Sequence, residues 1–342
     1  MHQIEMPEFA APDTNAAVDP VVVHDVTAEE RTEIVALAGT LTGPDHPLVD
    51  TPQWLSAALN ASSLLPRTLL HALRAFRHDP GPQGTLLLRG LPVVAGEQLP
   101  PTPGVPNSVE PVPTTAAAVI ATVMLQLGEV IAFRNEKHGH LVQNVVPVPG
   151  HEVSQSNAGS VLLELHIENA FHANRPDYVG LLSIREDPTG DAKLCTSSIR
   201  RALPLLDADV LQVLAEPRFR TDAPPSFGAR DGDGDGARSV HPILQGDLAD
   251  PNVVVDFAAT HPQDDMAKIA MAALRDAFVT TMSAHRLQVG DLAVVDNRVT
   301  VHGRTSFVPR YDGSDRWMER VYAHLDNRRS RVDRPGGSPV LG

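Results

Sequence analysis

A histidine and a carboxylate stand two residues apart in the stretch V-L-L-E-L-H-I-E-N, residues 161–169. In a β-strand, alternate side chains point to the same face, so Glu164, His166 and Glu168 would lie together, opposite the apolar residues between them. An imidazole beside a carboxylate supplies two of the three ligands of a mononuclear iron(II) site, and a second histidine supplies the third. Because His-x-Glu triplets also occur by chance, the stretch indicates a metal site only if the chain offers that histidine.

The candidate for the third ligand is His302, near the end of the chain. Residues 292–295 have the pattern of a buried strand, 296–298 that of a turn, and 299–304 that of a second strand, which contains His302. This second strand would complete the site if it lies beside the 161–169 stretch.

Two arginines follow His302 in the run D-R-W-M-E-R-V-Y, residues 315–322. Period two places four side chains of this run on one face: Arg316, Met318, Arg320 and Tyr322. Arginines that face an interior are costly unless they meet anions, and a planar guanidinium binds a carboxylate through two parallel hydrogen bonds. The run therefore indicates carboxylate binding. The alternative is an outward-facing arginine pair on an edge strand.

The composition limits the classes of protein and of partner. The chain has 342 residues, of which 42% are hydrophobic and 20% charged, as in a globular protein. A net charge of -14 argues against a nucleic-acid partner, and no apolar run reaches the length of about 20 residues that spans a membrane. Cys195 cannot form an internal disulfide and the N-terminus has no secretory pattern, so we expect a cytoplasmic protein. The oligomeric state is left open.

Helices are expected before the predicted strands. The capping box that starts at Thr27 begins one helical pattern, which continues to Leu41, and Pro52 fits the first turn of another. Further helices are expected at 69–76 and 114–127, and a buried strand at 84–91. The proline-rich residues 92–113 predict an extended connector.

In the second half of the chain, one long helical pattern runs from about Pro262 to His285. Its predicted buried stripe is Met266, Ile269, Ala273, Leu274, Ala277 and Phe278. Most of the remaining residues from 129 to 325 form short apolar runs between turns, which favours a β-sandwich or jelly-roll barrel with flanking helices. We interpret the glycine-aspartate run at 231–236 as an acidic surface loop, with a lid over a site as the alternative.

The motifs together resemble the clavaminate synthase-like family of iron(II)- and 2-oxoglutarate-dependent oxygenases, which includes amino-acid β-hydroxylases that act on free arginine and asparagine. The matching pieces are L-L-E-L-H-I-E-N-A-F-H at 162–172, V-V-D-N-R-V-T-V-H-G-R-T-S-F at 294–307, D-R-W-M-E-R-V-Y at 315–322, and two shorter ones at 86–93 and 201–206. The resemblance implies a mainly β fold with flanking helices and a double-stranded β-helix (jelly-roll, cupin-like) core. We expect a loose arm at 1–20, a single oxygenase domain at 21–328 and a C-terminal tail at 329–342.

The same resemblance implies the roles of the candidate ligands. His166, Glu168 and His302 would hold Fe(II), and Arg316 would bind the distal carboxylate of 2-oxoglutarate. Halogenating relatives replace the carboxylate ligand by a small residue, so the presence of Glu168 favours hydroxylation. The implied reaction uses O2 to hydroxylate an unactivated C–H bond, at Cβ of a free L-amino acid or a close derivative, with release of succinate and CO2.

Substrate-binding residues are also carried over from the family. Arg320 would bind the α-carboxylate of the substrate, and Glu168, Asn135 and Ser156 would lie at its α-amino end. Asp256 falls where the family places an acid that meets the substrate side chain, and a solvated aspartate after a strand is the alternative. The family usually has a longer acid or amide in place of Asn135.

Two further departures from the family concern Val254 and Leu194. Val254 stands where arginine-selecting relatives have a second acid, which weakens an arginine assignment. Leu194 stands near a position where family members offer a threonine hydroxyl to 2-oxoglutarate, and Thr196 could substitute only after a change of register.

Other functions remain compatible with the motifs. The same cofactor chemistry can end in desaturation or cyclisation, and the substrate could be bound to a carrier or be a peptide. A metal-binding jelly-roll module without activity, for example with zinc in the site, is the non-enzyme alternative. Arg316 and Arg320 argue against it, because neither is needed to hold zinc.

Overall fold

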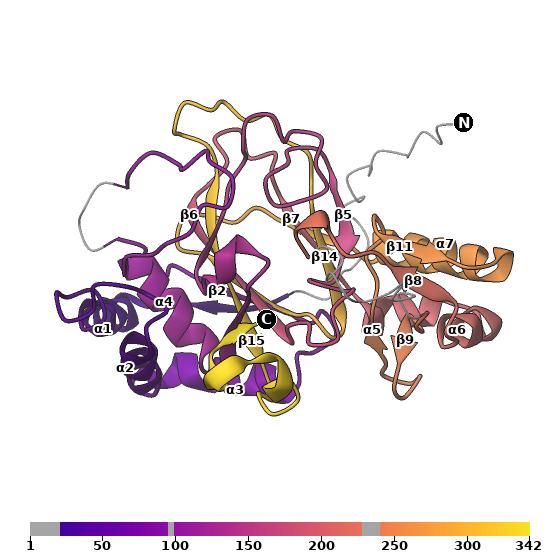
Figure 1. Ribbon diagram of the computed structural model, residues 1–342, viewed down its shortest axis with the longest axis horizontal. Helices are drawn as coiled ribbons and strands as arrows, with labels where there is room; N and C mark the ends of the chain where they lie inside the picture. The colour runs from indigo at the N-terminus through magenta and orange to yellow at the C-terminus, as the bar shows by residue number, and fades with distance from the viewer. Residues whose placement is uncertain (1–20, 95–98, 228–239) are drawn as a thin grey trace.

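The computed structural model describes residues 21–94, 99–227 and 240–342 (Figure 1). The arm expected at 1–20 and the acidic run at 231–236 lie outside these residues. The described chain is mainly β, with helices on the outside of two larger sheets. None of the helices in these ranges is both long and apolar enough to cross a membrane.

The N-terminal helices form as their end signals predict. In the first of them, Thr27 Oγ1 accepts from the backbone N–H of Glu30, and the Glu30 carboxylate accepts from the backbone N–H of Thr27. The second begins at Pro52 after the capping residue Thr51. The bounds are α1 Ala28–Gly39, α2 Pro52–Ser62, α3 Arg67–His78 and α4 Thr115–Met124. The described parts of the proline-rich connector, 92–94 and 99–113, contain no helix or strand, as expected.

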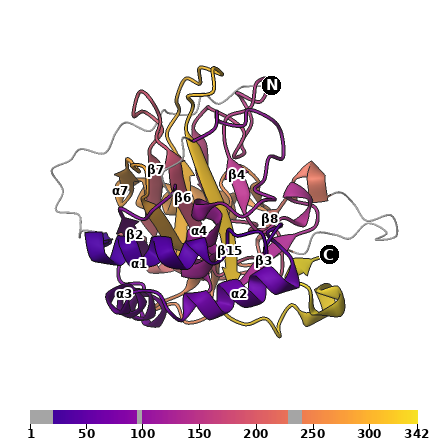
Figure 2. The same cartoon turned by 90° about the vertical axis from the view of Figure 1, so that its left-hand side faces the viewer.

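The larger sheet has eight strands in the order β1-β2-β13-β6-β15-β3-β16, with β4 paired to β15. Figure 2 shows α1, α2 and α3 across one face of it. Its central strands pair antiparallel, whereas β1 runs parallel to β2 and β16 parallel to β3. The bounds are β1 Val22–Asp25, β2 Thr85–Arg89, β3 Glu129–Phe133, β4 Gln143–Val145, β6 Tyr178–Arg185, β13 Leu292–Asp296, β15 Trp317–His324 and β16 Val340–Leu341. The last of these lies in the segment expected to be a tail.

Alternation along β15 gives this sheet two different faces. Trp317 and Val321 pack into the core formed with α1 to α4, whereas Met318 and Tyr322 belong to a smaller apolar cluster on the opposite face. The opposite face is therefore the one directed toward the second sheet, and it carries the arginines of the predicted site.

The second sheet has four strands in the order β12-β7-β14-β5. Their bounds are β5 Leu163–His166, β7 Leu194–Ser198, β12 Ser283–His285 and β14 Thr300–Arg304. Outside it lie α5 Ile199–Ala202, α6 Ala208–Leu214, α7 Asp265–Thr280 and the two-stranded pairs β8 Phe219–Thr221 with β11 Thr260–Pro262 and β9 Leu244–Gln245 with β10 Asn252–Val253. Short 3-10 turns lie at 137–139, 203–205, 225–227, 331–333 and 335–337.

The prediction for α7 was wrong in its ends and in the first half of its buried face, whereas Leu274, Ala277 and Phe278 are buried as predicted. The helix starts after Asp264, whose side chain accepts from the N–H of Ala267, so the residues at either end of the predicted helix belong to β11 and β12. Met266 and Ile269 are 55% and 67% exposed. The buried residues are Ala267, Ala270, Leu274, Ala277 and Phe278, because the small alanines, not the larger side chains beside them, face the apolar cluster of the second sheet.

Candidate active site

A cavity of about 670 Å³ lies between the two sheets and is lined by strands of both. From the second sheet it receives His166 on β5 and His302 on β14, and from the larger sheet Met318 and Arg320 on β15. Loops complete the lining and bring in Asn135, Ser156 and Asp256. All predicted site residues therefore line this one cavity: Asn135, Ser156, His166, Glu168, Asp256, His302, Arg316 and Arg320.

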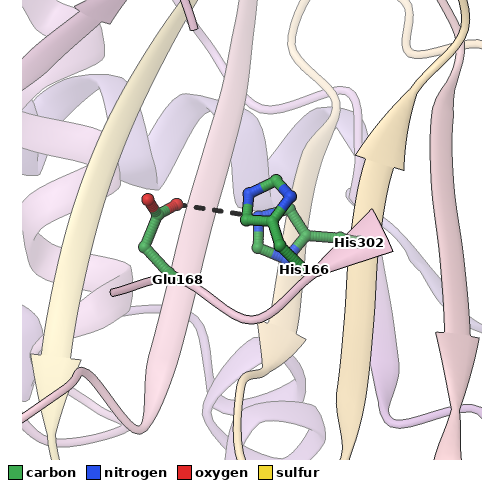
Figure 3. Close-up of side chains that lie close together, drawn as sticks. All are labelled: His166, Glu168 and His302. Carbon is green, nitrogen blue, oxygen red and sulfur yellow. Dashed lines mark ion pairs between the residues drawn. The ribbon is translucent and has the colours of Figure 1, made fainter. Parts of the chain in front are cut away.

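His166, Glu168 and His302 lie close enough to share one metal ion. One potential ligand atom from each lies within 4.8 Å of the others, and Figure 3 shows the three side chains gathered at one point. His302 pairs directly with His166 across β14 and β5, and Glu168 lies just beyond the end of β5. The distance from His302 Nε2 to Glu168 Oε2 is 3.6 Å.

A glycine after His302 allows this close pairing. A Cβ atom on Gly303 would lie 2.5 Å from the carbonyl oxygen of Leu163, so only glycine lets β14 approach β5 without displacing the backbone. The register between the two strands shifts after His302, where Arg304 pairs with Leu163. The irregularity keeps the two histidines opposite each other.

The protonation states suit a divalent metal. His166 Nδ1 lies 2.8 Å from the carbonyl oxygen of Glu164, which can only accept, so Nδ1 carries the proton and Nε2 offers a lone pair. Burial, together with the charge of His166, lowers the pKa of His302, which favours its neutral form. Burial alone would raise the pKa of Glu168, but Arg320 and the two histidines outweigh it and hold that pKa well below its usual range. The donor set is thus two imidazole nitrogens and one carboxylate.

Asn297 fixes the backbone of Glu168 and was missed in the sequence, where residues 296–298 read only as a turn. The N–H of Glu168 donates to Asn297 Oδ1 at 2.7 Å, and Asn297 Nδ2 donates to the carbonyl oxygens of Glu168 at 3.1 Å and Pro176 at 2.9 Å. Asn297 is only 1% exposed. Because β5 ends at His166, this side chain is what holds Glu168 beside the histidines.

Arg320 is held by side chains on three sides. Its Nη1 donates to Glu168 Oε1 at 3.1 Å, its Nη2 donates to Glu136, and its Nε and Nη2 donate to Gln143 Oε1 at 3.2 and 2.6 Å. Burial alone would lower the pKa of Arg320, but Glu168 and Glu136 raise it. The guanidinium stays charged and keeps one N–H of Nη1 beyond these contacts.

Glu136 is a second residue that the sequence did not reveal. It lines the cavity beside the predicted Asn135, and its Oε1 also accepts from the Tyr322 hydroxyl at 3.0 Å. Its Oε2 accepts from Asn169 Nδ2 at 3.2 Å. The only signal in the sequence is its position next to Asn135, since its partners are distant along the chain.

Arg316 has a very different environment. It is 8% exposed, its Nη2 lies 2.7 Å from the sulfur of Met318, and its Nη1 is buried without a hydrogen-bond partner. Burial lowers its pKa to about 10, although the nearby Asp187 acts in the opposite direction. Within the described ranges, no carboxylate forms an ion pair with it. An anion in the cavity would satisfy both its charge and its open N–H.

The side chains of Asp256 and Ser156 form hydrogen bonds with residues close to them in the sequence. Asp256 bridges to His166 through the backbone, and its Oδ1 accepts from the N–H groups of Ala258 and Ala259 at 2.8 and 3.2 Å. Ser156 Oγ lies 2.9 Å from Ser154 Oγ.

Leu194 lines the cavity and offers no hydroxyl. Thr196 does not replace it, because its Oγ1 lies 3.1 Å from His285 Nε2 and it is not among the cavity-lining residues.

Comparisons with known proteins agree with this geometry. The family model described as taurine catabolism dioxygenase TauD, TfdA family, matches residues 83–322. The chain is 48% identical to an L-asparagine oxygenase of Streptomyces coelicolor, over 95% of this chain and 97% of that protein. It is 35% identical to clavaminate synthase 2 of Streptomyces clavuligerus, over 86% and 90%.

The fold also matches a solved structure. The crystal structure of an asparagine oxygenase with Fe(II), (2S,3S)-3-hydroxyasparagine and succinate aligns with a TM-score of 0.89 at 46% identity, over 94% of this chain and 99% of that one. The resemblance to the clavaminate synthase-like oxygenases is therefore confirmed, and the chain belongs to the TauD/TfdA family of dioxygenases.

Proposed function

We propose that this protein is an iron(II)- and 2-oxoglutarate-dependent oxygenase that hydroxylates Cβ of a free L-amino acid, with L-asparagine as the first candidate. The observation that carries the proposal is the group His166, Glu168 and His302 in one cavity with Arg316, whose Nη1 has no partner among the described residues. The 48% identity to an L-asparagine oxygenase supports the choice of amino acid.

The three ligand residues fit iron(II). Two imidazoles from adjacent strands and a carboxylate just beyond the end of one of them provide the donor set that suits this ion and leaves positions for other ligands. When bound, the iron would supply the activation of O2 that couples decarboxylation of 2-oxoglutarate to C–H hydroxylation. Asn297 keeps Glu168 in place, and the hydrogen bond from His166 Nδ1 to the Glu164 carbonyl orients that imidazole.

The cosubstrate would lie toward Arg316. Its distal carboxylate would meet the open Nη1 of Arg316, and this pairing would remove the cost of a buried, unpaired guanidinium. Leu181 and Leu194 line the same cavity and would exclude water from the carbon chain of the cosubstrate.

The amino-acid substrate would lie toward Arg320. The remaining N–H of Arg320 Nη1 would donate to the α-carboxylate, and Glu136 and Glu168 would accept from the α-ammonium group, with Asn135 and Ser156 beside it. Asp256 lines the cavity and can accept from a side-chain N–H. A carboxamide offers such a donor, which is consistent with asparagine.

We extend the proposal to the architecture and the location. Two facing sheets that enclose the site, with helices on the outside, support a double-stranded β-helix core. We propose residues 21–328 as one oxygenase domain, because β1 and β2 from its start pair in the same sheet as β13 and β15 from its end. A buried Cys195 with its pKa raised to about 11 by burial is compatible with the cytoplasm, where we place the protein.

The proposed activity can be tested with a panel of L-amino acids that includes asparagine, arginine, ornithine and citrulline. With Fe(II), 2-oxoglutarate and O2, we expect succinate release coupled one to one to a product that is heavier by one oxygen atom. Asp256→Asn should change the preference within the panel. A product that has lost two hydrogens would identify desaturation or cyclisation instead, and uncoupled succinate with every amino acid would favour a carrier-bound or peptide substrate.

A further inference from the structure

A second buried arginine, Arg304, lies on the same strand face as His302. The two are separated by one residue of β14, so their side chains point to the same side, and both line the cavity. Arg304 is 4% exposed. Its Nη2 donates to the carbonyl oxygen of Val161 at 2.9 Å, whereas its Nε is buried without a hydrogen-bond partner.

Arg304 and Arg316 meet at one aromatic ring. The guanidinium carbon of Arg304 lies 4.9 Å from the centroid of Phe307, and that of Arg316 lies 5.5 Å from it. Burial, followed by the charge of Arg316, lowers the pKa of Arg304 to about 9. Two like charges thus share a buried corner of the cavity, and each has an N–H without an acceptor among the described residues.

The protein offers this corner little negative charge. Asp187 lines the cavity nearby, but its Oδ2 already accepts from Thr189 Oγ1 and from the N–H of Asp191, each at 2.7 Å. In the part of the chain that the structure describes, neither Arg304 nor Arg316 forms an ion pair with a carboxylate. Two buried guanidinium groups with only Asp187 nearby, and no direct ion pair, leave positive charge uncompensated, so the corner is suited to an anion from outside.

We propose that Arg304 is a second binding residue for the distal carboxylate of 2-oxoglutarate, so that this carboxylate lies between two arginines. The inference rests on the proposed function. One carboxylate oxygen would accept from Arg316 Nη1 and the other from Arg304 Nε, the two N–H groups that have no partner. The ring of Phe307 forms the apolar wall beside both guanidinium groups. If Arg304 had only a structural role, its hydrogen bond to the Val161 carbonyl would be sufficient, and its Nε would have no function.

The test compares two 2-oxo acids that differ only at the distal end. Iron(II)-loaded protein is titrated without oxygen with 2-oxoglutarate and with 2-oxopentanoate, which has a methyl group in place of the distal carboxylate. Binding is followed by the visible charge-transfer band of the chelate and by calorimetry. In Arg304→Met, we expect 2-oxoglutarate to bind about 10- to 100-fold more weakly, because a hydrogen bond to a charged group is lost. Binding of 2-oxopentanoate and of iron should be unchanged.

Two further variants serve as controls for the proposed role of Arg304. Arg304→Lys keeps the charge with a shorter reach, so it should give a smaller loss that is still selective for 2-oxoglutarate; this variant serves if the methionine variant does not fold. Arg185 lines the same cavity but donates to the carbonyl oxygens of Gly313 and Pro100, so Arg185→Met should cause no selective loss.

The outcomes separate the two proposals. Equal losses for both 2-oxo acids, no loss for either, or the same selective loss in Arg185→Met would overturn the role of Arg304. If wild-type protein chelates neither 2-oxo acid, the proposed oxygenase function itself fails.

Discussion

Arg316 and Arg320 lie on the same face of one chain segment, yet their environments are opposite. Arg320 donates to Glu136, Gln143 and Glu168, and the carboxylates among these raise its pKa. Among the described residues, Arg316 has the sulfur of Met318 and the ring of Phe307 beside its guanidinium and forms no ion pair, and burial lowers its pKa to about 10. The protein neutralises Arg320 itself, and we propose that Arg316 meets an external anion.

This difference suggests separate roles for the two ends of the cavity. At the Arg320 end, the arginine holds Glu168 in its ionised form beside the histidines, so it organises the candidate metal ligands. At the Arg316 end, Arg304 adds a second guanidinium with an N–H that has no partner among the described residues, and we propose that this region binds a carboxylate. Substitution of Arg320 should therefore lower stability, whereas substitution of Arg316 should not.

The largest effect on stability is expected for Arg320→Met. The substitution leaves Glu136 and Glu168 buried without their cation, so the free energy of unfolding should fall by about 3–5 kcal/mol. Urea unfolding at neutral pH, followed by circular dichroism, measures the change. A loss below about 1 kcal/mol would show that these carboxylates do not depend on the arginine.

Arg316→Met should leave stability unchanged or increase it, since it removes a buried N–H without a partner. The binding of 2-oxoglutarate should weaken about 100-fold, because the main charge-assisted hydrogen bonds of the distal carboxylate are lost. Calorimetry on the iron-loaded protein without oxygen measures the affinity. Destabilisation as large as that of Arg320→Met would remove the contrast between the two residues.

Asn297→Ala should weaken iron binding about 10-fold, because the backbone of Glu168 loses the contacts that hold it beside the histidines. Asn297→Asp is the matched control: it keeps an acceptor for the Glu168 N–H but loses the donor to two carbonyls. It should give an intermediate affinity in a chelator competition assay. Wild-type affinity in the alanine variant would contradict a role for Asn297.

The smallest effect concerns His324, at the far end of β15, which avoids a buried charge by staying neutral. Its Nε2 donates to the carbonyl oxygens of Asn174 and Arg175, its Nδ1 has no partner, and burial lowers its pKa to about 4. The unfolded chain takes up the proton first, so this stabilising contribution is complete above pH 6.5 and is lost as the pH falls toward 4.

His324→Gln should therefore reduce the loss of stability between pH 7 and pH 5 by about 1–2 kcal/mol. Urea unfolding of both proteins at the two pH values measures the difference. An identical pH dependence in the variant would show that another group controls acid unfolding.

Local patterns in the sequence were sufficient to predict the helices and strands that position the site. Alternation in 161–169 and 315–322 placed the histidine, the carboxylate and the arginines on cavity-facing sides, and capping signals located α1 and α2. The expected strand at 161–169 was too long, since β5 ends at His166.

Residues that act through distant partners could not be found in this way. Asn297 contacts Glu168 from far along the chain, and Glu136 reaches Arg320 from another loop. Neither has a local pattern, because the contacts exist only once segments that are distant along the chain lie side by side. The buried face of α7 was misjudged for a related reason: the larger apolar residues, Met266 and Ile269, are exposed, and small alanines make the close contact.

The central claim is that His166, Glu168 and His302 hold iron beside a 2-oxoglutarate site at Arg316. The most direct measurement is the addition of 2-oxoglutarate to iron(II)-loaded protein without oxygen, followed by visible absorption. We predict a weak charge-transfer band that saturates in the wild-type protein and is absent in His166→Ala. No band in the wild type, or an undiminished band in His166→Ala, would contradict the account.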